Sequence, residues 1–173
     1  MPLTLAILIF IAVMWIPVAL LFLGKGEAKG TGFATGVVGI LVVIGALVQA
    51  TPAFGQDVFG SGLLFAHGIL YIVVSYALLT GLSDMRSVGN VSLTVAIISL
   101  IYFLVYVYGT SLVPANAYLA LMCAGYTVLT VEVWLNAYGK FSGNLLAWSL
   151  IIWAFVGLWI PAFSVLTTGQ FPF

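Results

Sequence analysis

The sequence predicts an all-α integral membrane protein, a bundle of six transmembrane helices arranged as three helical hairpins. Of its 173 residues, 64% are hydrophobic and 5% are charged, and the mean hydropathy is +1.31. Apolar side chains therefore exceed what the interior of a water-soluble protein could bury. They fall into six runs, each about 20 residues long, which is the length of helix that crosses a bilayer. The runs are apolar on all sides rather than alternating, which favours helices over the strands of a barrel.

Short clusters of Gly, Pro, Ser and Asn separate the runs and set their order along the chain. The predicted spans are 3–23, 33–51, 62–82, 91–109, 115–137 and 144–166. We expect the first run to be a transmembrane helix rather than a cleaved signal, because no basic segment precedes it and it is long enough to span. No soluble segment remains between the runs, so we expect a single transmembrane domain over 1–173.

The basic residues predict the orientation of the bundle. They follow the first, third and fifth runs, and are Lys25, Lys29, Arg86 and Lys140. All four therefore lie on one side, which the positive-inside rule makes cytoplasmic. Both termini and the loops "TPAFGQDVFGSG" and "GTSLVPAN" are then expected outside. A net charge of zero gives no basic patch for nucleic acid, which excludes that class of partner.

A short pattern recurs in the three predicted cytoplasmic loops. Its copies are Lys29-x-x-Gly32, Arg86-x-x-Gly89-Asn90 and Lys140-x-x-Gly143-Asn144. One explanation is that every tight turn on this side needs a basic anchor and a flexible glycine. The other is that three related hairpins surround a central axis and leave a path along it. The sequence leaves both open.

Two ionisable side chains lie inside predicted spans, His67 and Glu132. A carboxylate in a membrane normally has a partner. Glu132 is expected either to serve as a proton relay or pore-lining acceptor, or to bond a neighbouring helix, helped by Asn136 at i+4. A lone histidine is more often a packing residue than a ligand. Cys123 is expected to be a small buried hydrophobe.

Chemistry that needs a cofactor or a catalytic group is not expected. A bis-histidine haem would require a second histidine, and the chain has one. The sequence has no Cys or His cluster for a metal, and no nucleophile, base and orienting group at motif spacing. We therefore predict no cofactor, no metal and no enzyme activity. The hydroxyls and aromatic rings in the spans suit a path for a small uncharged solute better than one for an ion.

Four stretches resemble the urea/amide channel family of the AmiS/UreI type. They occur in the family's order over most of the chain, and are "LFLGKGEAKG", "GLLFAHGILYIVVSY", "LNAYGKFSGN" and "GLWIPAF". The resemblance implies a six-helix bundle with both termini outside, assembled as a homohexamer around a lipid-filled centre in the bacterial inner (plasma) membrane. Each protomer would carry its own channel for urea or short amides.

The resemblance also implies which side chains line the pore. They are Leu8, Phe65, Ile69, Met122, Tyr126, Ser149 and Trp153. Ile69 stands where the urea-conducting member has a tyrosine. Ser149 or Trp153, one turn apart, stands where that member has a pore carboxylate, and the lost carboxylate points toward aliphatic amides rather than urea. The acid-gated member has histidines in its outer loops, and this chain has none there, so we expect no acid gating.

Helical phase separates the two buried ionisable groups from these positions. At about 100° per residue, Glu132 lies about 120° from Tyr126, and His67 lies about 160° from Phe65. Met122, Tyr126, Thr130 and Val133 share one face. If that face and Phe65 line the pore, Glu132 and His67 should face a neighbouring helix or subunit.

Three functions remain in view. The first is a passive channel for small uncharged amides. The second is a proton-coupled transporter that uses Glu132 as its relay, and the third is a membrane subunit that transports nothing by itself. The transporter predicts that Glu132→Gln abolishes flux and that an uncoupler stops uptake, and the subunit predicts no flux through the purified protein.

Overall fold

The computed structural model describes residues 2–173, and over these residues it is all-helical, as predicted. Six helical rods are long and apolar enough to cross a membrane. The elements are α1 (Pro2–Phe22), α2 (Ala28–Gln49), the 3-10 turn η1 (Pro52–Phe54), α3 (Val58–Thr80), α4 (Arg86–Tyr108), α5 (Ala117–Ala137), α6 (Gly143–Trp153), the π-helical turn η2 (Ala154–Trp159) and α7 (Ile160–Thr168). The last three run on as one rod, Gly143–Thr168, which forms the sixth span.

Polar caps explain why several helices begin outside the predicted spans. Helix α2 begins five residues early because the Glu27 carboxylate accepts hydrogen bonds from the backbone N–H groups of Lys29 and Gly30. Helix α3 begins four residues early, where the Asp57 carboxylate caps the N–H of Gly60 at 2.7 Å. Such caps satisfy N–H groups that a helix leaves free at its start. Hydropathy alone does not register them, so the predicted boundaries follow the apolar run rather than the helix.

Two of the three helix pairs are hairpins of consecutive helices, α2 with α3 and α4 with α5. Each is tied by a buried serine hydroxyl that donates to a backbone carbonyl of its partner helix. Ser75 donates to the Gly32 oxygen at 2.6 Å, and Ser92 donates to the Thr130 oxygen at 2.8 Å. Close approach makes these bonds possible. A Cβ at Gly39 of α2 would meet the backbone of α3 at about 3 Å, which fixes how α3 is rotated against α2.

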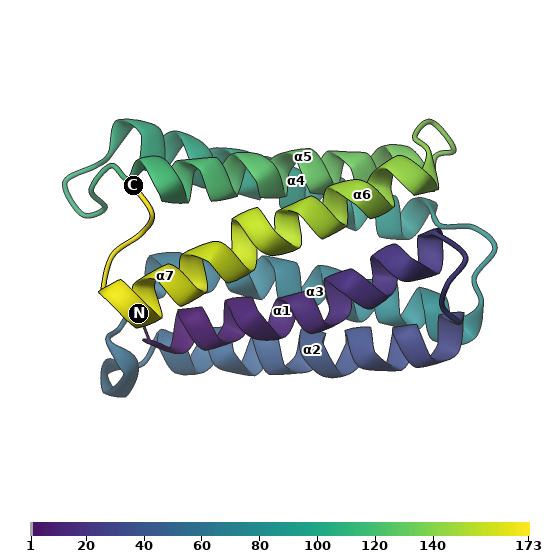
Figure 1. The fold of residues 1–173 in the computed structure, drawn as a ribbon, viewed down its shortest axis with the longest axis horizontal. Helices are drawn as coiled ribbons and strands as arrows, with labels where there is room; N and C mark the ends of the chain where they lie inside the picture. The colour runs from purple at the N-terminus through teal and green to yellow at the C-terminus, as the bar shows by residue number, and fades with distance from the viewer. Residues whose placement is uncertain (1) are drawn as a thin grey trace.

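The third pair joins the two ends of the chain. Helix α1 packs along α6, η2 and α7, and Figure 1 shows the two rods running in opposite directions. Both chain ends lie at one end of the bundle, which we call the terminal end (Figure 1). The turns that contain Lys25 and Lys140 lie at the other end, together with the turn that leads to Arg86 at the start of α4, and we call this the basic end.

The last transmembrane rod contains a π-helical turn whose cause is a proline. Pro161 has no N–H, so it cannot bond the carbonyl four residues back, Gly157, or five residues back, Val156. The Ile160 N–H, which would bond Val156 in an α-helix, donates to Phe155 instead. Val156 and Gly157, two adjacent carbonyls inside the membrane, therefore receive no hydrogen bond from residue 161.

Candidate functional site

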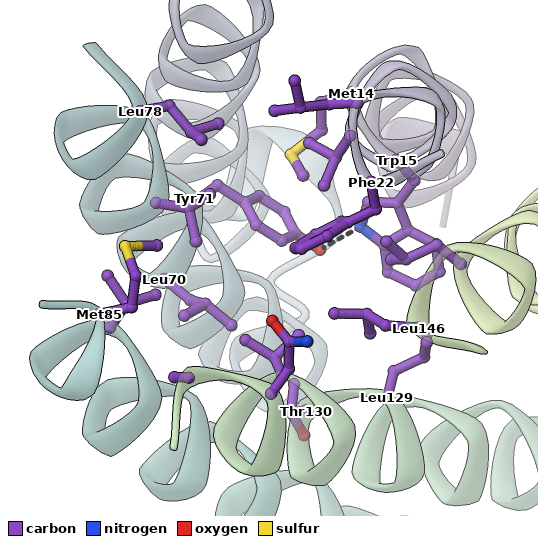
Figure 2. A pocket seen from close by; sticks show the side chains of 18 of the residues that line it. Met14, Trp15, Phe22, Leu70, Tyr71, Leu78, Met85, Leu129, Thr130 and Leu146 are labelled. Carbon is purple, nitrogen blue, oxygen red and sulfur yellow. Dashed lines mark hydrogen bonds between the residues drawn. The ribbon is translucent and has the colours of Figure 1, made fainter. Parts of the chain in front are cut away.

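Two cavities lie between the helices and follow one another along the bundle. The larger, about 580 Å³, opens toward the basic end, where Ser83, Asp84 and Gly139 line it. The smaller, about 110 Å³, lies toward the terminal end, where Thr4, Asp57 and Phe171 line it. We call them the basic-end cavity and the terminal-end cavity. Figure 2 shows the larger one, with Met14 and Leu78 among the side chains that surround it.

Four side chains line both cavities and separate them. They are Trp15 of α1, His67 and Tyr71 of α3, and Tyr126 of α5, and we call them the aromatic layer. Each is at most 7% exposed. Because the same rings form the floor of one cavity and the roof of the other, the layer is the constriction between them.

Ring contacts and one hydrogen bond hold the layer together. The Trp15 indole N–H donates to the Tyr71 hydroxyl at 3.3 Å, the dashed contact in Figure 2. The Trp15 and Tyr126 rings meet edge to face, with centroids 6.0 Å apart. The centroid of the His67 ring lies 5.5 Å from that of the Tyr126 ring and 6.1 Å from that of the Tyr71 ring. Edge-to-face aromatic contacts of this kind are favourable and directional, so they position the rings.

Helix α5 supplies the hydroxyls that the π-turn requires. Tyr126 donates to the Gly157 oxygen at 2.6 Å, and Tyr118 donates to the Val156 oxygen at 2.7 Å. These are the two carbonyls that Pro161 cannot reach. The bond from Tyr126 also sets the direction of its ring, which is part of the aromatic layer.

The two cavities are mainly apolar, with polar groups near their outer ends. In the terminal-end region, buried Gln49 donates to Asp57 at 2.7 Å and accepts from Thr4 at 2.9 Å. At the basic end, Asp84 and Arg86 form an exposed ion pair at 2.6 Å, and Arg86 holds the pKa of the Asp84 carboxyl below its usual range. Within residues 2–173, no three His, Cys, Asp or Glu side chains are grouped to hold a metal.

Several predicted pore residues do lie at these cavities. Leu8, Met122 and Tyr126 line the terminal-end cavity. Thr130 and Val133, on the same face of α5, line the basic-end cavity. One face of α5 therefore extends through both cavities.

The structure places the two predicted pore residues of α3 outside both cavities. Phe65 and Ile69 are 39% and 40% exposed on the outer surface of the protomer, and they line neither cavity. His67, which was expected to face a neighbour, lines both. The structure places His67 and Phe65 on opposite sides of α3, because the contact between α2 and α3 turns Phe65 outward. The pore position that the resemblance implies for Phe65 therefore coincides with neither cavity.

The structure also places the two predicted pore residues of the last rod, Ser149 and Trp153, outside both cavities. The Ser149 hydroxyl donates to the Glu132 carboxylate at 3.0 Å, which ties α6 to α5, and neither residue lines either of the two cavities. The Trp153 indole packs against Gly125, where a Cβ would overlap the ring. Asn136 does not assist Glu132. Its side chain lines the basic-end cavity and donates to the Phe141 carbonyl at 2.8 Å.

Sequence reasoning missed Trp15 and Tyr71 as site residues. Both were treated only as members of a large set of aromatic side chains, for which anchoring at the membrane surface is the usual role. A usable signal was the spacing of His67 and Tyr71, because residues four apart lie on one helix face. Two side chains with polar atoms on one face of an apolar span indicate a lined path.

The family follows from the sequence profile of the AmiS/UreI family transporters, which matches residues 3–169. The chain belongs to this family. A search of curated proteins found no match. Two solved structures share the fold of this AmiS/UreI protein. The Helicobacter pylori urea channel in its closed state, determined by cryo-electron microscopy, superposes with a TM-score of 0.81 at 21% identity, over 95% of this chain and 98% of that one.

The crystal structure of the urea channel from Helicobacter pylori gives a TM-score of 0.80 at 20% identity, over 98% of this chain and 99% of that one. At this identity the likeness establishes the fold of the AmiS/UreI chain and nothing finer. The family is one of transporters, not of enzymes, and its member described here is a multi-pass membrane protein.

The bond between Tyr126 and the π-turn gives a test of the site's architecture. In Tyr126→Phe the Gly157 carbonyl loses its donor inside the membrane, which should lower the free energy of unfolding by about 1–3 kcal/mol. Tyr76→Phe is the matched control, because Tyr76 is 61% exposed and should change stability by less than about 0.5 kcal/mol. Thermal unfolding in mild detergent measures both. Equal stability of the two variants would contradict the assigned role of the hydroxyl.

Proposed function

We propose that this AmiS/UreI protein is a passive channel for small uncharged amides, namely short aliphatic amides, urea or both. The observation that carries the proposal is the pair of cavities that share one aromatic layer. The path would run from the terminal-end cavity between Trp15, Tyr71 and Tyr126 into the basic-end cavity. A solute would then meet one narrow constriction between two wider chambers.

The chemistry of the path supports a neutral solute. The four side chains of the layer carry hydroxyl, indole and imidazole groups, and no carboxylate, ammonium or guanidinium. An ion that enters such a layer would lose its hydration without gaining a ring of carbonyl or charged ligands. A small amide needs only a few hydrogen bonds and a gap of its own size.

The orientation in the membrane and the assembly belong to the same proposal. By the positive-inside rule, the basic end faces the cytoplasm and the terminal end faces outward. The membrane would be the bacterial plasma membrane and the assembly a homohexamer with lipid at its centre, as the family resemblance implies. Phe65 and Ile69, on the outer surface of α3, would then face lipid or a neighbouring protomer.

A proton-coupled mechanism gains no support from the position of Glu132. This carboxylate bonds Ser149 and lines neither cavity, so it does not lie where a solute would meet it. Coupling usually requires ionisable groups on the solute path. We therefore assign Glu132 a structural role between α5 and α6.

Flux through the purified protein is the direct test. Proteoliposomes containing the full chain should equilibrate formamide, acetamide or urea faster than protein-free vesicles, because the cavities and the layer offer space and hydrogen-bonding groups inside the bilayer. Stopped-flow light scattering measures each rate. A response to all three solutes no faster than that of empty vesicles would refute the channel and favour a subunit without transport of its own.

Two controls separate a channel from a proton-coupled transporter. An uncoupler should leave the flux unchanged. Glu132→Gln should retain most of the flux, because the side-chain oxygen of the introduced glutamine can still accept a hydrogen bond from Ser149. Loss of flux in both experiments would identify Glu132 as a relay.

The flux is expected not to rise with external acid. Histidine is the side chain whose unperturbed pKa falls between pH 5 and 8, and the loops at the terminal end, 50–57 and 109–116, contain none. Acetamide flux at an external pH of about 5 should therefore not exceed flux at about pH 7. The same light-scattering assay, with the internal pH held constant, checks this. A sharp activation on acidification would contradict it.

A further inference from the structure

The aromatic layer contains a hydrogen-bond acceptor whose protonation state is set by the backbone. The His67 Nδ1 atom lies 3.0 Å from the Leu63 carbonyl oxygen, one helical turn earlier. A carbonyl can only accept, so Nδ1 must carry the hydrogen. In a neutral imidazole the other nitrogen is then an acceptor. The imidazole is neutral here because it is buried without an acidic partner, and an unpaired charge in that position would be costly.

This acceptor is unused in the structure. The Nε2 atom of His67 is buried and has no hydrogen-bond partner among residues 2–173. Native structures rarely leave a buried polar atom unpaired, so such an atom needs an explanation. Its ring lines both cavities, and a solute that moves from one cavity to the other must pass beside it.

A hydrogen-bond donor remains one turn further along the same helix face. The Tyr71 hydroxyl accepts from the Trp15 indole, and its own hydrogen has no acceptor among the bonds of the described residues. The other polar atoms of the layer are engaged, since Tyr126 donates to Gly157. The layer thus offers one free acceptor and one free donor, on rings whose centroids are 6.1 Å apart.

We propose that His67 Nε2 and the Tyr71 hydroxyl form the amide-recognition pair of the channel, with Nε2 accepting a solute N–H and Tyr71 donating to the solute carbonyl. A primary amide carries both groups, side by side, as does urea. The inference rests on the proposed function and adds to it the two residues that select the solute. An amide whose nitrogen carries two alkyl groups can accept from Tyr71 but has no N–H to donate to Nε2. Such an amide should therefore pass through the channel more slowly.

Nitrogen NMR can examine His67 alone, because the chain has one histidine. The protein is labelled with ¹⁵N-histidine, carried on a histidine-free affinity tag and reconstituted in lipid. We expect a protonated Nδ1 and a pyridine-type, unprotonated Nε2. Acetamide should shift the Nε2 signal toward the protonated range, and N,N-dimethylacetamide should not. A protonated Nε2, or an equal response to both solutes, would overturn the proposal.

Flux through variants provides the second measurement. His67→Phe keeps an aromatic ring but removes the acceptor, and should lower acetamide flux by about fivefold to tenfold, the loss of one hydrogen bond. Tyr71→Phe should cause a similar loss. Tyr76→Phe, on the exposed side of the same helix, is the control and should conduct like the wild type.

The outcomes separate the two claims. If the wild type conducts acetamide and His67→Phe conducts it equally, the recognition pair is wrong and the channel stands. If the wild type conducts no amide at all, the channel and the recognition pair fail together. The NMR experiment does not depend on whether either variant folds.

Discussion

The packing of this bundle depends on two tyrosine hydroxyls that satisfy two backbone carbonyls inside the membrane. Pro161 removes the N–H that would bond Val156 or Gly157, and lipid offers no water to replace it. Tyr118 and Tyr126 of α5 supply the missing hydrogens. The same bonds hold α5 against the π-turn and place the Tyr126 ring in the constriction. The missing N–H of Pro161 therefore accounts both for the π-turn and for the position of the Tyr126 ring in the constriction.

Most polar groups in and around the aromatic layer are already hydrogen-bonded within the protein. Serine hydroxyls tie α2 to α3 and α4 to α5, and Ser149 ties α6 to Glu132, and none of these three serines lines either cavity. Inside the layer, the Trp15 and Tyr126 donors are already engaged. What remains free is the Nε2 acceptor of His67 and the Tyr71 hydrogen. A nearly neutral path with one free acceptor and one free donor is suited to a solute that carries both.

The fold could be predicted from the sequence because lipid leaves so few alternatives. Apolar runs of spanning length must be helices, and Lys25, Arg86 and Lys140 do lie at or beside the turns of one end of the bundle. The rotation of each helix about its axis could not be read in the same way, because α3 is apolar all round. Its rotation is decided by the contact with α2, where Gly39 allows close approach. That contact turns His67 inward and Phe65 outward, whereas the resemblance to the family implied Phe65 as a pore residue.

Thiol modification of α3 tests most directly whether a solute crosses between the two cavities. Leu63 lines the terminal-end cavity and Phe65 lies on the outer surface, so cysteine is introduced at each position in a Cys123→Ala background. Mass spectrometry confirms labelling by a small methanethiosulfonate, and acetamide flux is measured before and after. Modified Leu63→Cys should lose most of its flux, and modified Phe65→Cys should keep it. Block at position 65 with full flux at position 63 would show that the path follows the other face of α3.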